Sequence, residues 1–204
     1  MVKKKAAETD ASAEEKIKEA ARKVFMMKGY AATRTRDIAE EAGLNLALLN
    51  YYFRSKEKLF EIVMMEKVEK LFGIIAPVIN DASTTLEQKI EQVAINYMDM
   101  LSVNPDLPLF VMSEIRNNPD RFVSKIQAGK LIQESYLVKQ LKEKRPDVNP
   151  LHFIVSLLGM ILFPFIARPV LQAAANISSK GFQAMMEERK AYIPRWVKAI
   201  LKAR

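Results

Sequence analysis

Between residues 29 and 60, two short segments with helical apolar spacing flank Gly43, and this arrangement constrains the fold more than any other part of the chain. The segment 35–42 predicts a short helix, which Gly43 ends because glycine accepts the left-handed backbone of a tight turn. Asn45 is suited to cap the next helix at its N-terminus. The pattern predicts a helix-turn-helix, although two ordinary packed helices joined by a glycine would share the same spacing.

The helix that follows Asn45 has one face for packing and another for contact with a partner. Leu49 and Phe53 stand four residues apart and share a face, whereas Leu46, Ala47 and Asn50 fall on another. Small, amide and aromatic side chains can contact thymine methyl groups and adenine edges in a major groove, which admits an α-helix. Basic residues suited to phosphates surround this segment: Arg34, Arg36, Arg54, Lys56 and Lys58. The alternative is a solvated basic face.

Apolar residues recur at helical spacing along nearly the whole chain, and no segment shows the sustained alternation of a strand. We therefore expect an all-α protein. Half of the 204 residues are hydrophobic, so the chain can bury a substantial core. Ser12 and Glu15 form a capping box for the first predicted helix, which Gly29 ends.

Composition argues against several kinds of site. The chain has no cysteine and one histidine, His152, which excludes disulfides and thiolate metal sites and disfavours histidine-rich ones. We find no nucleophile with its base, no phosphate-binding glycine loop and no metal cluster, and so expect no enzyme, no catalytic residues, no cofactor and no metal. The net charge of +8 favours a polyanionic partner, either nucleic acid or an anionic membrane. The N-terminus does not read as a secretory signal, and we expect a cytoplasmic protein.

A specific resemblance covers about the first third of the chain. Its order, spacing and residue types resemble the TetR family of transcription regulators, through Ile17, Ala20, Ala21, Phe25, Gly29, Tyr30, Thr33, the RDIAEEAG and YYF segments, Lys56 and Leu59. The resemblance implies a homodimer that binds double-stranded, pseudo-palindromic operator DNA, usually as a repressor released by a small hydrophobic or amphipathic effector. We accordingly expect a flexible basic arm over 1–11, a helix-turn-helix domain over 12–60, and a helical effector-binding and dimerisation domain over 61–204.

The same resemblance implies roles for individual residues. It places phosphate contacts near Thr33 and Thr35, on Tyr51 or Tyr52, and on Lys56, and it lets Arg36 reach bases. The predicted DNA-binding set is Thr33, Arg34, Thr35, Arg36, Leu46, Ala47, Asn50, Tyr51, Tyr52 and Lys56. Two positions depart from the family, which commonly has a polar residue in place of Leu46 and a phosphate-binding tyrosine in place of Asn50. The operator sequence therefore does not follow from the resemblance.

The remaining helices are expected to form a ligand pocket. A helix after Lys56 should end before Pro77 and connect the two domains, and another should begin at Pro119 and run toward Arg145. Apolar side chains suited to pocket walls are Met98, Leu101, Phe110, Met112, Phe122, Ile126 and Tyr136. Apolar residues at helical spacing are also typical of an ordinary core.

The longest apolar run, residues 151–167, carries no charge and requires burial. It is somewhat shorter than the roughly 20 residues of a membrane span, and it contains Pro164. The resemblance instead implies a dimer interface on the last two long helices, for which we expect Phe153, Leu157, Met160, Ile161, Trp196 and Ile200. Two alternatives stay open: an architectural DNA-binding dimer without a ligand, and a membrane-surface protein that uses this run and the basic C-terminal segment.

Overall fold

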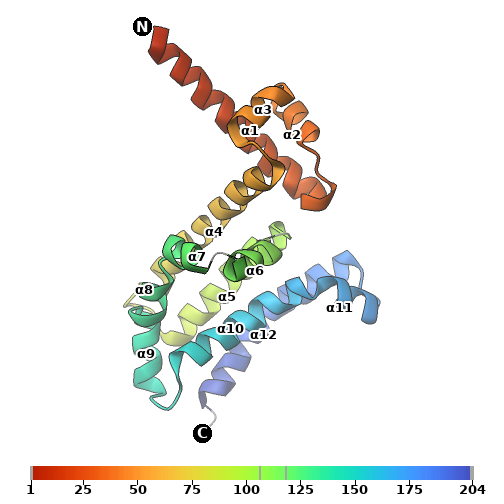
Figure 1. The fold of residues 1–204 in the computed structure, drawn as a ribbon. Coiled ribbons are helices and arrows are strands. Elements are labelled where there is room, and N and C mark those ends of the chain that lie inside the picture. Colours follow the sequence, from red (N-terminus) through yellow and green to blue (C-terminus); the bar gives the residue numbers. More distant parts are fainter. Residues whose placement is uncertain (1, 106, 118, 203–204) are drawn as a thin grey trace. The chain divides into compact units, whose positions relative to one another are not determined.

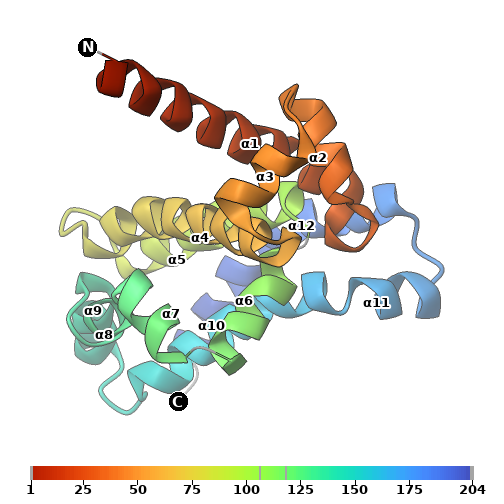
Figure 2. The same ribbon diagram turned by 45° about the horizontal axis from the view of Figure 1, so that its top comes forward.

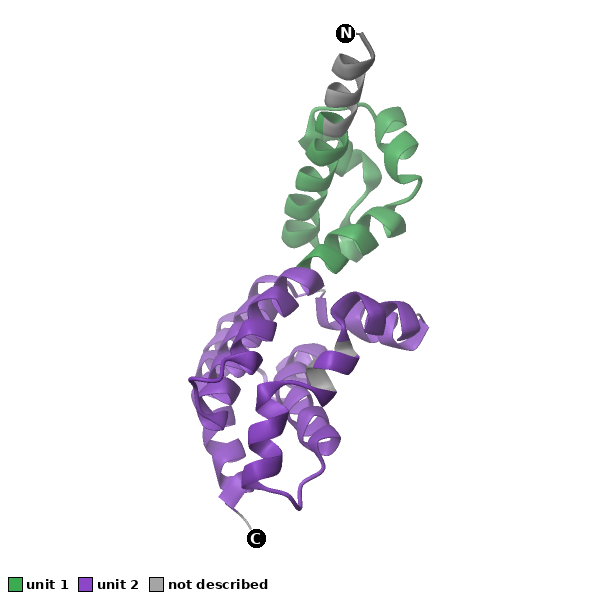
Figure 3. Ribbon diagram, turned by 90° about the vertical axis from the view of Figure 1, so that its left-hand side faces the viewer, with its two compact units in different colours: residues 1–67 green, residues 68–204 purple. Residues whose placement is uncertain are grey.

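A computed structural model describes residues 2–105, 107–117 and 119–202, except for the side chains of residues 2–11, 128, 131 and 132. Within these ranges the regular structure is helical, and no strand occurs among them. The all-α fold expected from the apolar spacing is thus confirmed. The chain divides into two compact units, residues 1–67 and 68–204, which Figure 3 shows in green and purple.

The first unit packs short helices around a small apolar core (Figure 1). Its elements are α1 (Val2–Ala32), α2 (Thr35–Ala42), α3 (Leu46–Phe53) and the start of α4 (Lys56–Asn80), which continues into the second unit. The buried side chains recur at the helical spacing that the sequence predicts, and include Ile17, Ala21, Phe25, Ile38, Leu49, Phe53, Leu59 and Val63. Each helix therefore contributes one apolar stripe to a common core.

The N-terminal part of α1 differs in two ways from the expected boundaries. The flexible arm predicted over residues 1–11 falls outside the described side chains, and the backbone from Val2 is helical. Gly29, the predicted end of the first helix, has φ 72° and ψ 167°, so the helical dihedrals break there within α1. The structure then continues helical to Ala32 before α2 begins.

The turn between α2 and α3 has the geometry that its sequence predicts. Gly43 has φ 65° and ψ 30°, and its N–H donates to the carbonyl oxygen of Glu40 at 3.1 Å. The N–H of Leu44 donates to the carbonyl oxygen of Ala39 at 3.0 Å, which completes a Schellman motif. Asn45 then caps α3, because its Oδ1 accepts the N–H of Leu48 at 2.7 Å. These local bonds fix the angle at which α3 leaves α2.

A network of charged side chains joins α1 to α4 within the first unit. Nε and Nη2 of Arg22 donate to Oε2 of Glu66 at 3.0 and 2.8 Å. Nη1 of the same guanidinium donates to Glu15 at 2.9 Å and to Glu19 at 3.0 Å. A planar guanidinium has five donors, so a single arginine can bind all three carboxylates. The network holds α1 and α4 together beside the apolar core.

The second unit is a bundle of helices in which α5 lies along α12 and α10 contacts both (Figures 1 and 2). Its elements after α4 are α5 (Leu86–Val103), α6 (Leu107–Asn117), α7 (Pro119–Ile126), α8 (Ala128–Gln133), α9 (Tyr136–Lys144), α10 (Pro150–Ile166), α11 (Arg168–Ala174) and α12 (Ser179–Lys202). The buried face of α5 includes Ile90, Ala94, Met98 and Leu101. The central position of α5 explains why these side chains are buried.

Two predicted helix boundaries in this unit are wrong. The helix expected to end before Pro77 continues to Asn80, because Gly73 and Pro77 are both exposed and solvent can reach the backbone where the proline N–H is missing. The single helix expected from Pro119 toward Arg145 is divided into α7, α8 and α9. Gln127 breaks it with a φ of 51°, and Ser135 caps α9 by accepting the N–H of Val138 at 3.4 Å.

The apolar run predicted to need burial forms most of α10. Within the described ranges, no single helix is both long and apolar enough to cross a membrane, while α10 and α11, bent by 63°, satisfy the test only as a pair.

The left-handed backbone of Gly43 yields a prediction about stability. We expect Gly43→Ala to lower the free energy of unfolding by about 1–2 kcal/mol, because a Cβ is unfavourable in this conformation. A thermal melt of the full chain should show a lower midpoint, by about 2–4 °C per kcal/mol. Gly43→Asn is the control, since asparagine tolerates this conformation and should cost less. Equal midpoints for Gly43→Ala and the wild type would contradict the assigned geometry.

Candidate functional site

The exposed face of α3 is the first candidate site. Leu49 and Phe53 are buried, while Ala47, Asn50 and Tyr51 are exposed, as the two predicted faces require. Tyr51 is 74% exposed, an unusual state for a large aromatic side chain. The helix thus presents a methyl group, an amide and a phenol outward, while its other face holds it to the core.

The start of α2 adds positive charge and hydrogen-bond donors. Arg34 and Arg36 are exposed, and Thr35 is partly exposed at the first position of the helix. The N–H of Arg34 donates to Oδ2 of Asp37 at 2.9 Å, and Nζ of Lys28 lies 3.2 Å from the same oxygen. The Arg34 N–H and the Lys28 ammonium lower the pKa of the Asp37 carboxyl, so it stays ionised at neutral pH. The two arginine side chains remain directed to solvent.

Thr33 and Lys56, two of the residues expected to contact phosphate, are engaged inside the protein. Thr33 is 2% exposed, and its hydroxyl donates to the carbonyl oxygen of Gly29 at 2.7 Å. Nζ of Lys56 donates to the carbonyl oxygens of Tyr30 and Thr33 at 3.1 and 3.0 Å. It also lies 4.2 Å from the centroid of the Tyr30 ring.

These contacts correct the expected role of both side chains. Carbonyl oxygens at the end of a helix lack intrahelical donors, and the Lys56 ammonium supplies two of them at the end of α1. Thr33 and Lys56 therefore hold the connection from α1 to α2 in place. A sequence motif records that a lysine recurs at a position but does not indicate whether its ammonium points outward or inward.

Arg54 has a strained backbone directly after α3. Its φ is 61° and its ψ is −41°, and the N–H of Ser55 donates to the carbonyl oxygen of Phe53 at 2.6 Å. This bond closes a γ-turn with a positive φ, a rare conformation that glycine would adopt more easily. Backbone strain of this kind is concentrated at functional sites. The exposed guanidinium thus stands at the end of the partner-facing helix at a cost in local stability.

The predicted DNA-binding set therefore separates into three groups by exposure. Exposed members are Arg34, Arg36, Ala47, Asn50 and Tyr51, partly exposed members are Thr35, Leu46 and Tyr52, and Thr33 and Lys56 have their polar groups bound internally. The first two groups lie on α2, on α3 or immediately before α2. Chemically they offer guanidinium, hydroxyl and amide groups around a helix slim enough to enter a major groove.

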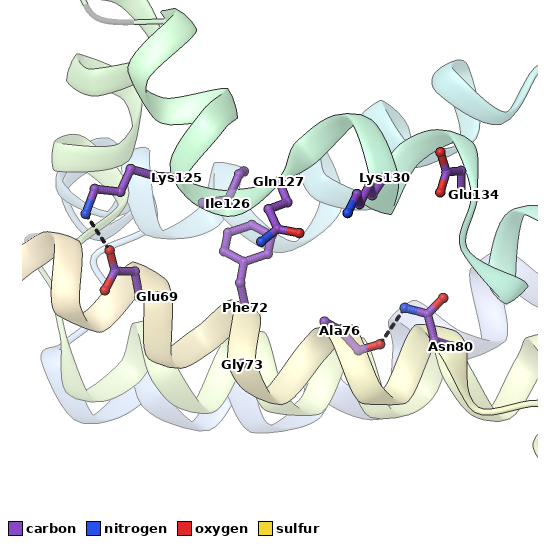
Figure 4. A pocket seen from close by; sticks show the side chains of 10 residues that line it. All are labelled: Glu69, Phe72, Gly73, Ala76, Asn80, Lys125, Ile126, Gln127, Lys130 and Glu134. Atoms are coloured by element: carbon purple, nitrogen blue, oxygen red, sulfur yellow. Dashed lines mark hydrogen bonds and ion pairs between the residues drawn. The ribbon is translucent and has the colours of Figure 1, made fainter.

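The second candidate site is an open cavity of about 460 Å³ in the second unit. Figure 4 shows its walls, one from α4 and the other from α7 and α8. The residues that line it are Glu69, Phe72, Gly73, Ala76, Asn80, Lys125, Ile126, Gln127, Lys130 and Glu134. Nζ of Lys125 and Oε1 of Glu69 form an ion pair of 2.9 Å between the two walls. We call this space the outer cavity.

A smaller and almost wholly apolar cavity of about 150 Å³ lies in the same unit, and we call it the inner cavity. It is enclosed by α4, α5, α9 and α10 together with the end of α7, and its lining is Phe72, Ile75, Ile79, Val93, Ile126, Ser135, Leu137, Ile154, Leu157 and Leu158. An apolar chamber with few polar groups is the usual form of a small-molecule site.

Most of the predicted pocket residues do not line these cavities. Ile126 lines both, and Leu101 borders a separate space of about 30 Å³, which is too small for an effector. The others divide between the packed core, with Met98, Phe110 and Phe122, and the exposed surface, with Met112 and Tyr136. Sequence reasoning missed the α4 wall, although Gly73 in the middle of a helix marked a position where a side chain is absent.

The apolar surface of α10 and α12 also differs from the expected interface. Phe153, Leu157 and Ile161 are buried within the second unit, and Met160 is partly buried. A helix that is apolar on all sides does not reveal which stripe faces inward, so the sequence could not separate them. The exposed apolar side chains, which we call the α10–α12 face, are Leu151, Val155 and Phe163 on α10 and Tyr192, Trp196 and Ile200 on α12.

Sequence comparisons agree with this division of the molecule. Residues 17–63 match the profile described as "Bacterial regulatory proteins, tetR family". "Probable HTH-type transcriptional regulator YttP" of Bacillus subtilis is 26% identical over 162 residues, which cover 76% of this chain and 78% of YttP. "HTH-type transcriptional repressor KstR2" of Mycolicibacterium smegmatis is 33% identical over 135 residues, which cover 58% of this chain and 65% of KstR2.

Solved structures share the fold over nearly the whole chain. A TetR-family transcriptional regulator from Mesorhizobium loti superposes with a TM-score of 0.63 at 21% identity, covering 94% of this chain and 97% of that one. The fatty acid degradation regulator FadR from Bacillus halodurans superposes with a TM-score of 0.53 at 19% identity, covering 89% and 97%. At this level of identity the likeness concerns the fold.

The internal role of Lys56 yields a prediction. We expect Lys56→Met, which keeps the apolar stem, to lower the free energy of unfolding by about 2 kcal/mol, because two carbonyl oxygens lose a charged donor. Lys58→Met is the matched control, since Nζ of Lys58 makes an exposed ion pair of 2.9 Å with Glu61. Such a pair contributes about 0.5 kcal/mol. Urea unfolding of both variants would measure the difference, and similar losses would refute the assignment.

Proposed function

The chain belongs to the TetR family of bacterial transcriptional regulators, and on this basis we propose that it is a dimeric repressor released from a pseudo-palindromic operator by a small hydrophobic or amphipathic effector. One observation carries the proposal: the outward face of α3, with exposed arginines beside it, belongs to the unit that matches the family profile. The repressor named KstR2 among its relatives supports the sign of regulation.

Recognition of DNA follows from the chemistry of the exposed side chains. α3 enters the major groove, where the Asn50 amide is suited to pair with adenine and the Ala47 methyl group to contact thymine. Arg34, Arg36 and Tyr51 contribute contacts to phosphate oxygens, which orient the helix without reading sequence. Because the two helices of a dimer read equivalent half-sites, the half-site centres lie about one helical turn, or a multiple of it, apart.

Dimerisation is proposed to use the α10–α12 face. Six large apolar side chains are exposed there, and the rings of Tyr192 and Trp196 stack with centroids 5.7 Å apart. A second copy of the chain covers such a face with an identical patch, as a two-fold interface requires. The resemblance placed dimerisation on the last two long helices, and the exposed residues narrow it to one stripe of each.

Release by an effector is proposed to act through α4. This helix is continuous from Lys56, whose ammonium holds the end of α1, to Asn80, which lines the outer cavity. A ligand changes DNA affinity only if it binds two conformations unequally, and a cavity wall formed by α4 offers that difference. An architectural dimer without a ligand would have no need of the two cavities.

Selection of bound duplexes from a random pool, repeated with candidate metabolites, tests the whole proposal. We expect recovered sequences to share two half-sites, and at least one metabolite to reduce recovery of all of them. Recovery without any common sequence would overturn specific recognition. Retention of one sequence class with every metabolite tried would favour the architectural dimer.

Arg54 and Asn50 yield a paired prediction about DNA affinity. We expect Arg54→Gly to unfold at higher temperature, by relief of roughly 1 kcal/mol of backbone strain, yet to bind all duplexes more weakly and with a salt slope about one unit smaller. Asn50→Ala should instead change preference at particular bases. Titration of labelled duplexes at several salt concentrations separates the two. A uniform loss for Asn50→Ala would contradict base reading.

The α10–α12 face yields a prediction about assembly. Val155 is 59% exposed on α10, so Val155→Glu should leave the fold intact and place a charge within the proposed interface. We expect sedimentation equilibrium to show a shift from dimer to monomer, and operator affinity to fall with it. Gln92→Glu, at an exposed position of α5, is the control and should remain dimeric. A dimeric Val155→Glu variant would place the interface elsewhere.

A further inference from the structure

Phe72 and Ile126 line both the outer and the inner cavity of the second unit. In Figure 4 the ring of Phe72 points from α4 toward Ile126 at the end of α7. These two side chains therefore stand between the cavities and separate them. Phe72 is only partly buried, so its ring can move without a large rearrangement of the core. We call this pair the partition.

The inner cavity is suited to a ring-sized apolar group. Its walls are apolar apart from Ser135, whose hydroxyl accepts the N–H of Val138 as the cap of α9. An apolar cavity of about 150 Å³ stays free of water and is large enough for benzene. A charged or strongly hydrated group would lose its solvation there without gaining partners. Only the apolar part of a ligand fits this space.

The outer cavity is suited to an uncharged group that forms hydrogen bonds. Its charged residues balance, because Lys125 and Lys130 are matched by Glu69 and Glu134. Gln127 adds an amide, and Pro77 has no N–H to donate to the carbonyl oxygen of Gly73 in the α4 wall. The space therefore offers both donors and acceptors without a net charge.

We propose that the effector is an amphipathic molecule with a ring-sized apolar end and an uncharged, hydrogen-bonding head, and that the partition opens to admit the apolar end to the inner cavity. The head stays in the outer cavity between α4 and α8. This inference rests on the proposed function, since it names the class of effector that the second unit binds. It adds the division of the site and the two residues that control passage between its halves.

Gly73 allows the outer cavity to be filled selectively. A Cβ built on Gly73 has no atom within 4 Å, so Gly73→Leu extends into open space without a clash. Replacement of a mid-helix glycine also favours the helix. For the inner cavity, Leu158→Phe adds volume to the α10 wall, and Ile154→Phe is a second variant in case the first does not fold. Gln92→Leu, exposed on α5, adds the same leucine away from both cavities.

Calorimetric titration of the full chain with 4-phenylbutan-1-ol tests the inference, with circular dichroism to verify folding. We expect binding to the wild type and to Gln92→Leu with equal affinity, and affinity lower by about tenfold or more for the folded cavity-filling variants, because each excludes one part of the probe. The charged analogue 4-phenylbutanoate should bind the wild type more weakly than the alcohol. Phe72→Ala should bind the alcohol faster in stopped-flow measurements, since no ring has to move.

Several results would overturn the inference. They are absence of binding to the wild type, equal affinity in Gly73→Leu and Gln92→Leu, undiminished affinity in a folded inner-cavity variant, tighter binding of the carboxylate than of the alcohol, or an unchanged association rate in Phe72→Ala. Operator binding, measured in parallel, separates this failure from that of the proposed function. The probe pattern with unaltered operator affinity removes only the regulatory step, whereas operator release without the pattern removes only the divided site.

Discussion

The ammonium of Lys56 holds together the part of the molecule on which DNA recognition depends. It donates to two carbonyl oxygens at the end of α1 and lies over the ring of Tyr30, so the start of α4 and the connection to α2 are fixed together. The orientation of α3 then follows from the Schellman turn at Gly43 and the Asn45 cap. Because α4 provides this anchor, any displacement of its first turn also displaces the exposed residues before α2.

The basic residues of the first unit therefore have two different tasks. Lys56 and Arg22 are bound to carbonyl and carboxylate oxygens of the protein, and they stabilise the packing of α1 and α4. Arg34, Arg36 and Arg54 are exposed and available to a polyanion. Arg54 in addition occupies a strained γ-turn at the end of α3. Net charge alone would count all of these residues alike, although only the exposed group attracts DNA phosphates.

The continuation of α4 past Pro77 determines the architecture of the second unit. Its residues from Glu69 to Asn80 form one wall of the outer cavity, and Phe72 together with Ile75 and Ile79 reaches the inner one. A helix that ended before Pro77 would leave Asn80 outside this wall. The exposed position of the proline allows the helix to continue, and the absent side chain of Gly73 leaves the wall open.

The sequence by itself determined the all-α class, the turn at Gly43, the cap at Asn45 and the two faces of α3, because each depends on helical periodicity or on the backbone of one residue. Only the tertiary structure decided that Lys56 and Thr33 point inward, that Phe153, Leu157 and Ile161 face the core, and that α4 forms a cavity wall. These outcomes depend on contacts between residues far apart in the chain. A uniformly apolar helix such as α10 carries no periodic signal that distinguishes its core side from an exposed one.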